Sequence, residues 1–289
     1  YSYQKLKSVK MAKQILFTIL ILTTYVAQSQ GIKYGGSIDL GVGGVESVSK
    51  VQQYYDQLVQ KDQDLNEKTI KSKPGTAFGI SGMAEYYLKK NISLFGGLQI
   101  LRQKNSIELY EKEQKNNGDY KEIKSTATVS ISSVIFPITF KYPFDIGKGK
   151  HPYMFGGTSL EFRVSKKMDS EETKIKFDAK DNDTQTNQFS FSDKDLEGFN
   201  TSSMNLVLGI GMDYVLSKDK VVYANLSFTT TAGKNEMWAK NLSSGSGNND
   251  PKNSKIFDKS EHDAIVAAGY KLNDWKSTRY MLSVGMMIK

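Results

Sequence analysis

The chain has 289 residues, no cysteine and a formal net charge of +8. The lack of cysteine excludes a disulfide framework, a lipid-anchored cysteine and thiolate metal sites. The first 29 residues hold four lysines and no acid, which leaves 35 basic against 31 acidic residues in the remainder. This small surplus is spread among acids from residue 50 onward, so it indicates solvated surface and no nucleic-acid partner.

The N-terminal region has the residue order of a secretory signal peptide. Lys13 is followed by an apolar stretch over residues 15–26 and by the small residues Ala27 and Ser29. The apolar stretch is too short to span a bilayer comfortably, so a retained membrane anchor is the weaker interpretation. The expected organisation is as follows: residues 1–10 outside the fold, residues 11–29 as signal peptide, and residues 30–289 as one outer-membrane barrel domain.

Eight stretches alternate apolar and polar residues with a period of two, which is typical of β-strands. They cover residues 32–44, 76–88, 92–101, 128–144, 152–164, 204–216, 221–231 and 277–289. In the stretch 204–216 every even-numbered residue is apolar, whereas Asn205 and Asp213 lie on the opposite face. Pro137 lies inside the fourth stretch and predicts a shift of register near Ser132 or Ser133.

The connections between these stretches alternate between short and long. The short ones cover about residues 89–91, 143–151 and 217–220, and the long polar ones about residues 46–74, 105–124, 167–200 and 234–276. This layout predicts an all-β fold, an eight-stranded antiparallel transmembrane barrel of the outer membrane of a Gram-negative bacterium, with short periplasmic turns and four long extracellular loops.

One segment, residues 262–275, has an apolar content that suits either a strand or a helix. We assign it to the fourth long loop, as a helical turn or a hairpin above the membrane. The alternative is a ten-stranded barrel in which residues near 234–274 supply an extra hairpin.

Several of these stretches resemble the PorT-like family of small bacterial outer-membrane barrels. The similar patterns are an apolar strand with Pro137, Lys141 and Tyr142, a strand that opens Pro152-Tyr153 and continues Gly156-Gly157, and the spacing Gly209-x-Gly211-x-x-Tyr214. The resemblance implies an eight-stranded barrel over residues 31–289 and a link to protein secretion, and it implies no catalytic residues. One departure is that the chain stops at Lys289, where such barrels carry a final aromatic residue.

The inward face of the predicted barrel carries a set of polar and charged residues. These are Lys33, Asp39, Glu85, Gln99, Lys141, Glu161, Arg163, Asp213, Asn225 and Arg279. Because eight strands enclose a space that side chains fill, we expect these groups to pair across the lumen and leave no open pore. A narrow proton or water path is the alternative. Asp213 and Asn205 are expected to meet Arg163, Arg279 or Lys141.

The chain offers few residues for catalysis, and we predict that it is not an enzyme and has no cofactor. Its two histidines are His151, beside a short turn, and His262, which lies between Glu261 and Asp263 in a long loop. A barrel hydrolase that uses His262 is one alternative. A soluble periplasmic lipocalin-like barrel, with its apolar face turned inward, is another.

Two further patterns are weak indications of a ligand site. Asp181, Asp183, Asp193 and Asp195 are weak candidates for a divalent metal ion, because only part of a calcium-loop pattern is present. The glycine runs at 41–44 and 209–211 lack the strand-to-helix context of a nucleotide site, and glycine inside a tight barrel explains them.

Long loops above a rigid barrel are typical binding elements. The expected partners are therefore outer-membrane lipid, lipopolysaccharide and a protein partner that binds through the extracellular loops.

Overall fold

The computed structural model describes residues 31–45, 48–89, 92–144, 149–195, 201–232, 264–265, 267–269 and 277–289. The regular elements in these residues are β1 (Ile32–Val45), α2 (Val48–Lys61), β2 (Leu65–Lys73), β3 (Gly75–Lys89), β4 (Ile92–Gln114), β5 (Tyr120–Pro143), β6 (Lys150–Asp178), β7 (Asp183–Asp195), β8 (Ser202–Ser217), β9 (Lys220–Thr231) and β10 (Ser277–Ile288). The predicted signal peptide and the residues before it lie outside the described residues.

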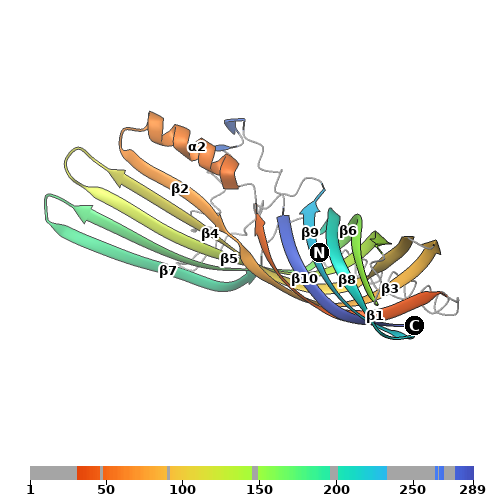
Figure 1. The fold of residues 1–289 in the computed structure, drawn as a ribbon. Helices are drawn as coiled ribbons and strands as arrows, with labels where there is room; N and C mark the ends of the chain where they lie inside the picture. Colours follow the sequence, from red (N-terminus) through yellow and green to blue (C-terminus); the bar gives the residue numbers. More distant parts are fainter. Residues whose placement is uncertain are drawn as a thin grey trace, which may run out of the picture.

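Eight of the strands close into an antiparallel barrel (Figure 1). The wall runs in the order β4, β3, β1, β10, β9, β8, β6 and β5, and β5 pairs again with β4. The prediction of eight barrel strands is confirmed. The ten-stranded alternative is wrong, because β10 pairs directly with β9 from Thr278↔Thr230 to Ile288↔Lys220 and leaves no place for a hairpin between them.

The outer surface of the barrel wall is apolar. On β8 the side chains of Leu206, Leu208 and Ile210 are 48%, 60% and 63% exposed, although the hydrophobic effect would bury such side chains in a water-soluble protein. Aromatic pairs border this band at both ends: Tyr142 with Phe144 near the short turns, and Phe136 with Phe162 and Phe228 with Tyr280 near the long connections. Apolar bands with aromatic borders are the exterior of membrane barrels.

The height of the band agrees with this assignment. From Met204 to Tyr214 the chain advances ten residues along β8, which is about 33 Å of strand and about 25 Å along the barrel axis at a tilt of about 40°. This matches the apolar thickness that an outer-membrane barrel presents to lipid. The fold is therefore an eight-stranded transmembrane β-barrel of the outer-membrane type.

Three barrel strands continue far beyond the membrane band and build a second structure. β4, β5 and β6 extend outward, and with β2 and β7 they form an extracellular sheet in the order β2, β4, β5, β6, β7 (Figure 1). The expected loops 46–74, 105–124 and 167–200 are thus largely strand and helix. Their composition misled the prediction because one face of this sheet meets water, so polar residues outnumber apolar ones.

Helix α2 covers the inner face of this sheet at β2. Val51 and Tyr55 recur at helical spacing and are fully buried, and Ile70 of β2 is buried on the same side. Buried residues of the extracellular sheet and helix include Val51, Tyr55, Leu65, Ile70, Ile107, Leu109, Ile123, Ala127, Val129 and Met168. The sheet has therefore an apolar core of its own. No helix in the described part of the chain is long and apolar enough to cross a membrane.

Two local irregularities follow from the sequence. The pairing of β5 with β6 shifts between Ser132 and Ser133, where the sequence predicts a shift. Pro137 has no N–H to donate, and the ladder between β5 and β4 is interrupted there, between Gly96↔Ile138 and Gln99↔Ile135.

The segment 262–275 is described only in part. Ala264 and Ile265 are helical, the amide of Ala268 donates to the carbonyl of Ala264 at 3.0 Å, and Ile265 is fully buried. A helical turn is therefore present in this segment.

Candidate functional site

The lumen holds an ionic cluster near the extracellular end, centred on Glu161 of β6. Arg279 Nη2 lies 2.7 Å from Glu161 Oε2, and Arg163 Nε lies 3.8 Å from Oε1. Ser133 and Asn205 also donate to this carboxylate, at 2.7 and 3.1 Å. A buried carboxylate with two arginines and two neutral donors is well compensated, so the cluster ties β5, β6, β8 and β10 together across the barrel.

A second ionic cluster lies near the short turns and is centred on Lys141 of β5. Its Nζ atom lies 2.6 Å from Asp213 Oδ2 and 3.3 Å from Glu85 Oε1, and Ser93 donates to Glu85 at 2.6 Å. The ammonium also lies 4.2 Å from the centroid of the Tyr153 ring. The Lys141 ammonium thus forms ion pairs with two carboxylates that come from opposite sides of the barrel.

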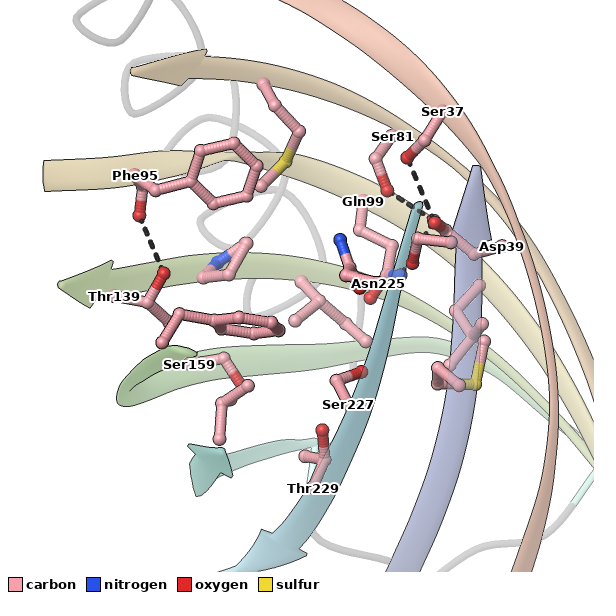
Figure 2. Close-up of a pocket in the computed structure, with 18 of the residues that line it drawn as sticks. Ser37, Asp39, Ser81, Phe95, Gln99, Thr139, Ser159, Asn225, Ser227 and Thr229 are labelled. Atoms are coloured by element: carbon pink, nitrogen blue, oxygen red, sulfur yellow. Dashed lines mark hydrogen bonds between the residues drawn. The ribbon is translucent and has the colours of Figure 1, made fainter. Parts of the chain in front are cut away.

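Between the clusters lies a small polar cavity around Asp39 (Figure 2). Asp39 is 1% exposed and accepts hydrogen bonds from Ser37 at 3.0 Å, from Gln99 at 2.8 Å and from Ser81. The cavity has a volume of about 70 Å³, and Ser159, Ser227 and Thr229 are among the other side chains that line it. This volume and polarity suit a few water molecules, and the space is too small for an organic ligand.

Aromatic rings fill much of the remaining lumen, and glycines make room for them. A Cβ atom added at Gly211 would collide with the ring of Tyr153, and one added at Gly209 would collide with the ring of Phe155. Phe95 and Tyr223 pack edge to face, with centroids 6.2 Å apart. The glycines of the stretch 204–216 are therefore a packing requirement of the barrel interior.

The structure brings most of the expected lumen residues into these clusters. Asp213 meets Lys141, one of its three expected cations, and Asn205 meets Glu161, whereas Arg163 and Arg279 both serve Glu161. The expected residues outside the two ionic clusters are Asp39 and Gln99, which bond to each other; Asn225, which lines the cavity; and Lys33, whose ammonium lies 5.1 Å from the Tyr87 ring centroid.

The predicted lumen network leaves out the hydroxyl groups that complete it. Ser37, Ser81, Ser93 and Ser133 all donate to the inward carboxylates. The period-two alternation places these serines on the same face as the charged residues, but it does not give their hydrogen-bond partners.

The weak metal candidates do not gather into a site. Asp181 and Asp183 lie at one end of β7, whereas Asp193 and Asp195 lie at the other end, about 30 Å away at the rise of a strand. Among the described residues no group of three His, Cys, Asp or Glu residues is arranged to hold a metal ion. His262 lies outside the described residues, and His151 is a half-buried residue at the start of β6.

A larger hollow, of about 350 Å³, lies at the distal tips of the β4–β5 and β6–β7 hairpins. Its lining includes Glu113, Lys121 and Lys176, which carry charges of both signs, and the neutral Gln185. Asp119 joins the two tips, because its carboxylate accepts from the amide N–H of Ala179 at 2.9 Å. This bond and the side chain of Asn117 hold the pKa of Asp119 below its usual range.

No protein-family model matches the chain, and no curated protein matches it. Among solved structures, it is similar to Neisserial surface protein A (12% identity, 90% of this chain and 99% of that chain, TM-score 0.33). It is also similar to Ail, the attachment invasion locus protein of Yersinia pestis, in complex with the heparin analogue sucrose octasulfate (10% identity, 90% of this chain and 100% of that chain, TM-score 0.26). A third similar structure is the outer membrane protease OmpT from Escherichia coli (10% identity, 90% of this chain and 97% of that chain, TM-score 0.34). The fold and the chemistry of the site rest on this chain's own residues.

Proposed function

We propose that the protein is a non-enzymatic outer-membrane barrel that holds a binding sheet rigidly above the cell surface. The observation that carries the proposal is the continuity of three strands: β4, β5 and β6 are 23, 24 and 29 residues long and run from the barrel wall into the extracellular sheet. Ordinary strands have five or six residues. Such continuity holds the sheet in one orientation, as a binding platform requires and as mobile loops do not provide.

The contents of the lumen support a role that does not involve transport. Two ionic clusters and the rings of Tyr153, Phe155, Phe95 and Tyr223 occupy the space inside the wall. A hollow of about 70 Å³ between them is no continuous channel. The barrel therefore serves as an anchor.

The outer surface supports contact with outer-membrane lipid and lipopolysaccharide. The apolar band meets lipid tails, and the aromatic pairs at its borders meet the interface with the head groups. The link to protein secretion that the PorT-like resemblance implies is part of this proposal, with the extracellular sheet as the element that binds a protein partner.

Cysteine labelling on intact cells tests the orientation of the sheet. The chain contains no cysteine, so each introduced thiol is unique. Thr128→Cys on the sheet should react with a membrane-impermeant maleimide, whereas Asp219→Cys in the β8–β9 turn should react only after lysis. Equal labelling of both variants on intact cells, or labelling of neither, would contradict the proposal.

Conductance across planar bilayers tests the closed lumen. The purified protein should pass no measurable ion current, and the double variant Glu161→Ala, Arg279→Ala should also stay closed, because the Lys141 cluster and the aromatic rings still fill the lumen. Steady current through the unaltered protein would show that the barrel is a channel.

A further inference from the structure

The two edges of the extracellular sheet differ in how they are protected. At the β2 edge, the side-chain amide of Gln52 from α2 takes the place of a neighbouring strand: its Oε1 accepts from the N–H of Ile70 at 2.6 Å, and its Nε2 donates to the carbonyl of Lys68 at 3.2 Å. Both backbone groups point away from β4, so they belong to the free edge of the sheet. One side chain thereby satisfies a donor and an acceptor that another strand would otherwise use.

Charge protects the β2 edge as well. Four of the nine residues of β2 are charged, namely Glu67, Lys68, Lys71 and Lys73. Lysine-rich edges resist pairing with another strand because the incoming strand would have to desolvate or displace those charges. The β2 edge is therefore closed to strand addition.

The middle of the β7 edge, in the described part of the chain, has neither feature. β7 pairs with β6 from Lys167↔Asp195 to Asp178↔Asp183, and the described part of the chain places no strand on its other side. Residues 181–188 are all exposed. From Thr184 to Ser192 the strand has nine consecutive residues without charge, proline or glycine. Nothing in this stretch opposes the addition of another strand.

We propose that the outer edge of β7 binds an extended segment of a partner polypeptide, which adds to the sheet as its next strand. The inference rests on the proposed function, because it names the surface and the kind of partner that the extracellular sheet binds. An unpaired edge presents alternating N–H and C=O groups, and another extended backbone satisfies such a row completely. A glycan or lipid head group has no matching repeat.

The charges at the ends of β7 specify the partner further. Asp181 and Asp183 lie at one end of the uncharged stretch, and Asp193 and Asp195 lie at the other. The sequence of the second end also contains Lys194, and Lys167 of β6 lies opposite Asp195 in the register, so the first end is the more acidic one. A partner strand with Lys or Arg at the end that meets Asp181 and Asp183, and no acid at its other end, complements this pattern. A second copy of β7 would pair antiparallel and place acidic ends against acidic ends, so the partner is a different polypeptide.

Synthetic peptides provide the test. The probe is a fluorescent 13-residue peptide with nine alternating Thr and Val residues between two lysines at each end. One control replaces the lysines by glutamates, and a second carries N-methyl groups on every interior amide. Binding to the full chain in lipid nanodiscs is measured by fluorescence anisotropy. The glutamate peptide should bind about tenfold more weakly than the lysine peptide, and the N-methylated peptide should not bind.

Two matched variants separate the edge from the face of the sheet. Gln188 on β7 and Thr173 on β6 are direct cross-strand neighbours, and only Gln188 lies at the edge. Gln188→Lys should weaken binding of the lysine peptide about tenfold, through loss of the neutral edge and charge repulsion, whereas Thr173→Lys should change it less than about twofold.

Several outcomes would overturn the inference. They are binding that survives N-methylation, equal losses in the two variants, self-association of the chain that Gln188→Lys abolishes, and no binding of any peptide at concentrations up to about 1 mM. The cell-labelling and conductance experiments do not depend on the peptide. A closed, correctly oriented barrel that fails to bind it would contradict this inference and leave the anchor proposal standing.

Discussion

The barrel and the extracellular sheet share three strands, yet they bury opposite kinds of side chain. On β5 the inward side chains are mostly polar in the barrel, as at Thr139 and Lys141, and mostly apolar in the sheet, as at Ile123 and Val129. The outward side chains change in the reverse sense, from Phe140 in the barrel to exposed Lys124 in the sheet. One strand thus crosses from lipid to water without changing which face it turns inward.

The position of the change marks the boundary between the two solvents. Outward residues of β5 are apolar up to Val134 and polar from Ser132 onward, at the place where the pairing register also shifts. Outside the membrane, burying apolar surface stabilises the sheet, as in soluble proteins. Inside the membrane, lipid already solvates the apolar face, so the barrel is specified by polar groups paired in its lumen. The surrounding solvent therefore decides which face of a strand serves as the core.

The largest expected effect comes from Glu161 in the lumen. Glu161→Ala should lower the free energy of unfolding by about 3–5 kcal/mol, because Arg163 and Arg279 would lose their buried counter-charge. The measurement is urea unfolding in detergent micelles followed by intrinsic fluorescence. Glu122→Ala on the outer face of the sheet, which removes the ion pair with the exposed Lys124, should cost less than about 1 kcal/mol. Equal effects of the two variants would show that lumen charges are not the core of the barrel.

The second-largest expected effect tests whether the outer face of the barrel meets lipid. Leu208→Lys places a charge in the apolar band and should destabilise the barrel by about 2–4 kcal/mol. Thr128→Lys places the same side chain on the water-facing side of β5 and should change stability by less than about 0.5 kcal/mol. For both variants, the measurement is the fraction of the protein that stays folded on heating, read from its migration on a gel of unboiled samples. Tolerance of Leu208→Lys would place this face in water.

A smaller effect concerns the fit inside the barrel. Gly211→Ala should destabilise the barrel by about 1–3 kcal/mol, because the methyl group collides with the Tyr153 ring and approaches the Ala224 carbonyl. A Cβ atom at Gly82 would meet nothing within 4 Å, so Gly82→Ala should be neutral or should stabilise by up to about 1 kcal/mol. Denaturant midpoints of the two variants give the difference, and a neutral Gly211→Ala would indicate a loosely filled lumen.

The smallest effect is a pH dependence confined to the sheet. The pKa of Asp119 is lowered in the folded state, so its stabilising contribution is present above the pKa of the unfolded chain and is lost as the pH falls through the folded value. Hydrogen exchange at the Ala179 amide, corrected for its intrinsic pH dependence, should lose protection as the solution is acidified. Asp119→Asn should make this protection independent of pH, and a residual pH dependence in that variant would assign it to another group.

Much of the barrel could be predicted from local pattern. Period-two alternation identified all eight wall strands and the inward position of Asp213 and Lys141, because a strand repeats every two residues wherever it lies. The extracellular sheet escaped prediction. Residues such as Ile107 and Ile123 alternate with charged neighbours at too low a density of apolar residues to stand out from a loop, and β7 is almost wholly polar.

The sequence determines which face of the barrel each wall residue takes, whereas the tertiary structure determines which residues it contacts. The face that each wall residue takes follows from the sequence, since alternation along one strand needs no other strand. Which groups meet depends on strand order and register: Lys141 and Asp213 are 72 residues apart, and they touch because β5 and β8 both pair with β6, which lies between them in the wall. Likewise, the Gln52 amide closes the β2 edge only once α2 has packed on the sheet, whereas no described strand pairs with the outer edge of β7. Contacts between distant segments are set by the whole barrel and sheet, and no short stretch of sequence contains them.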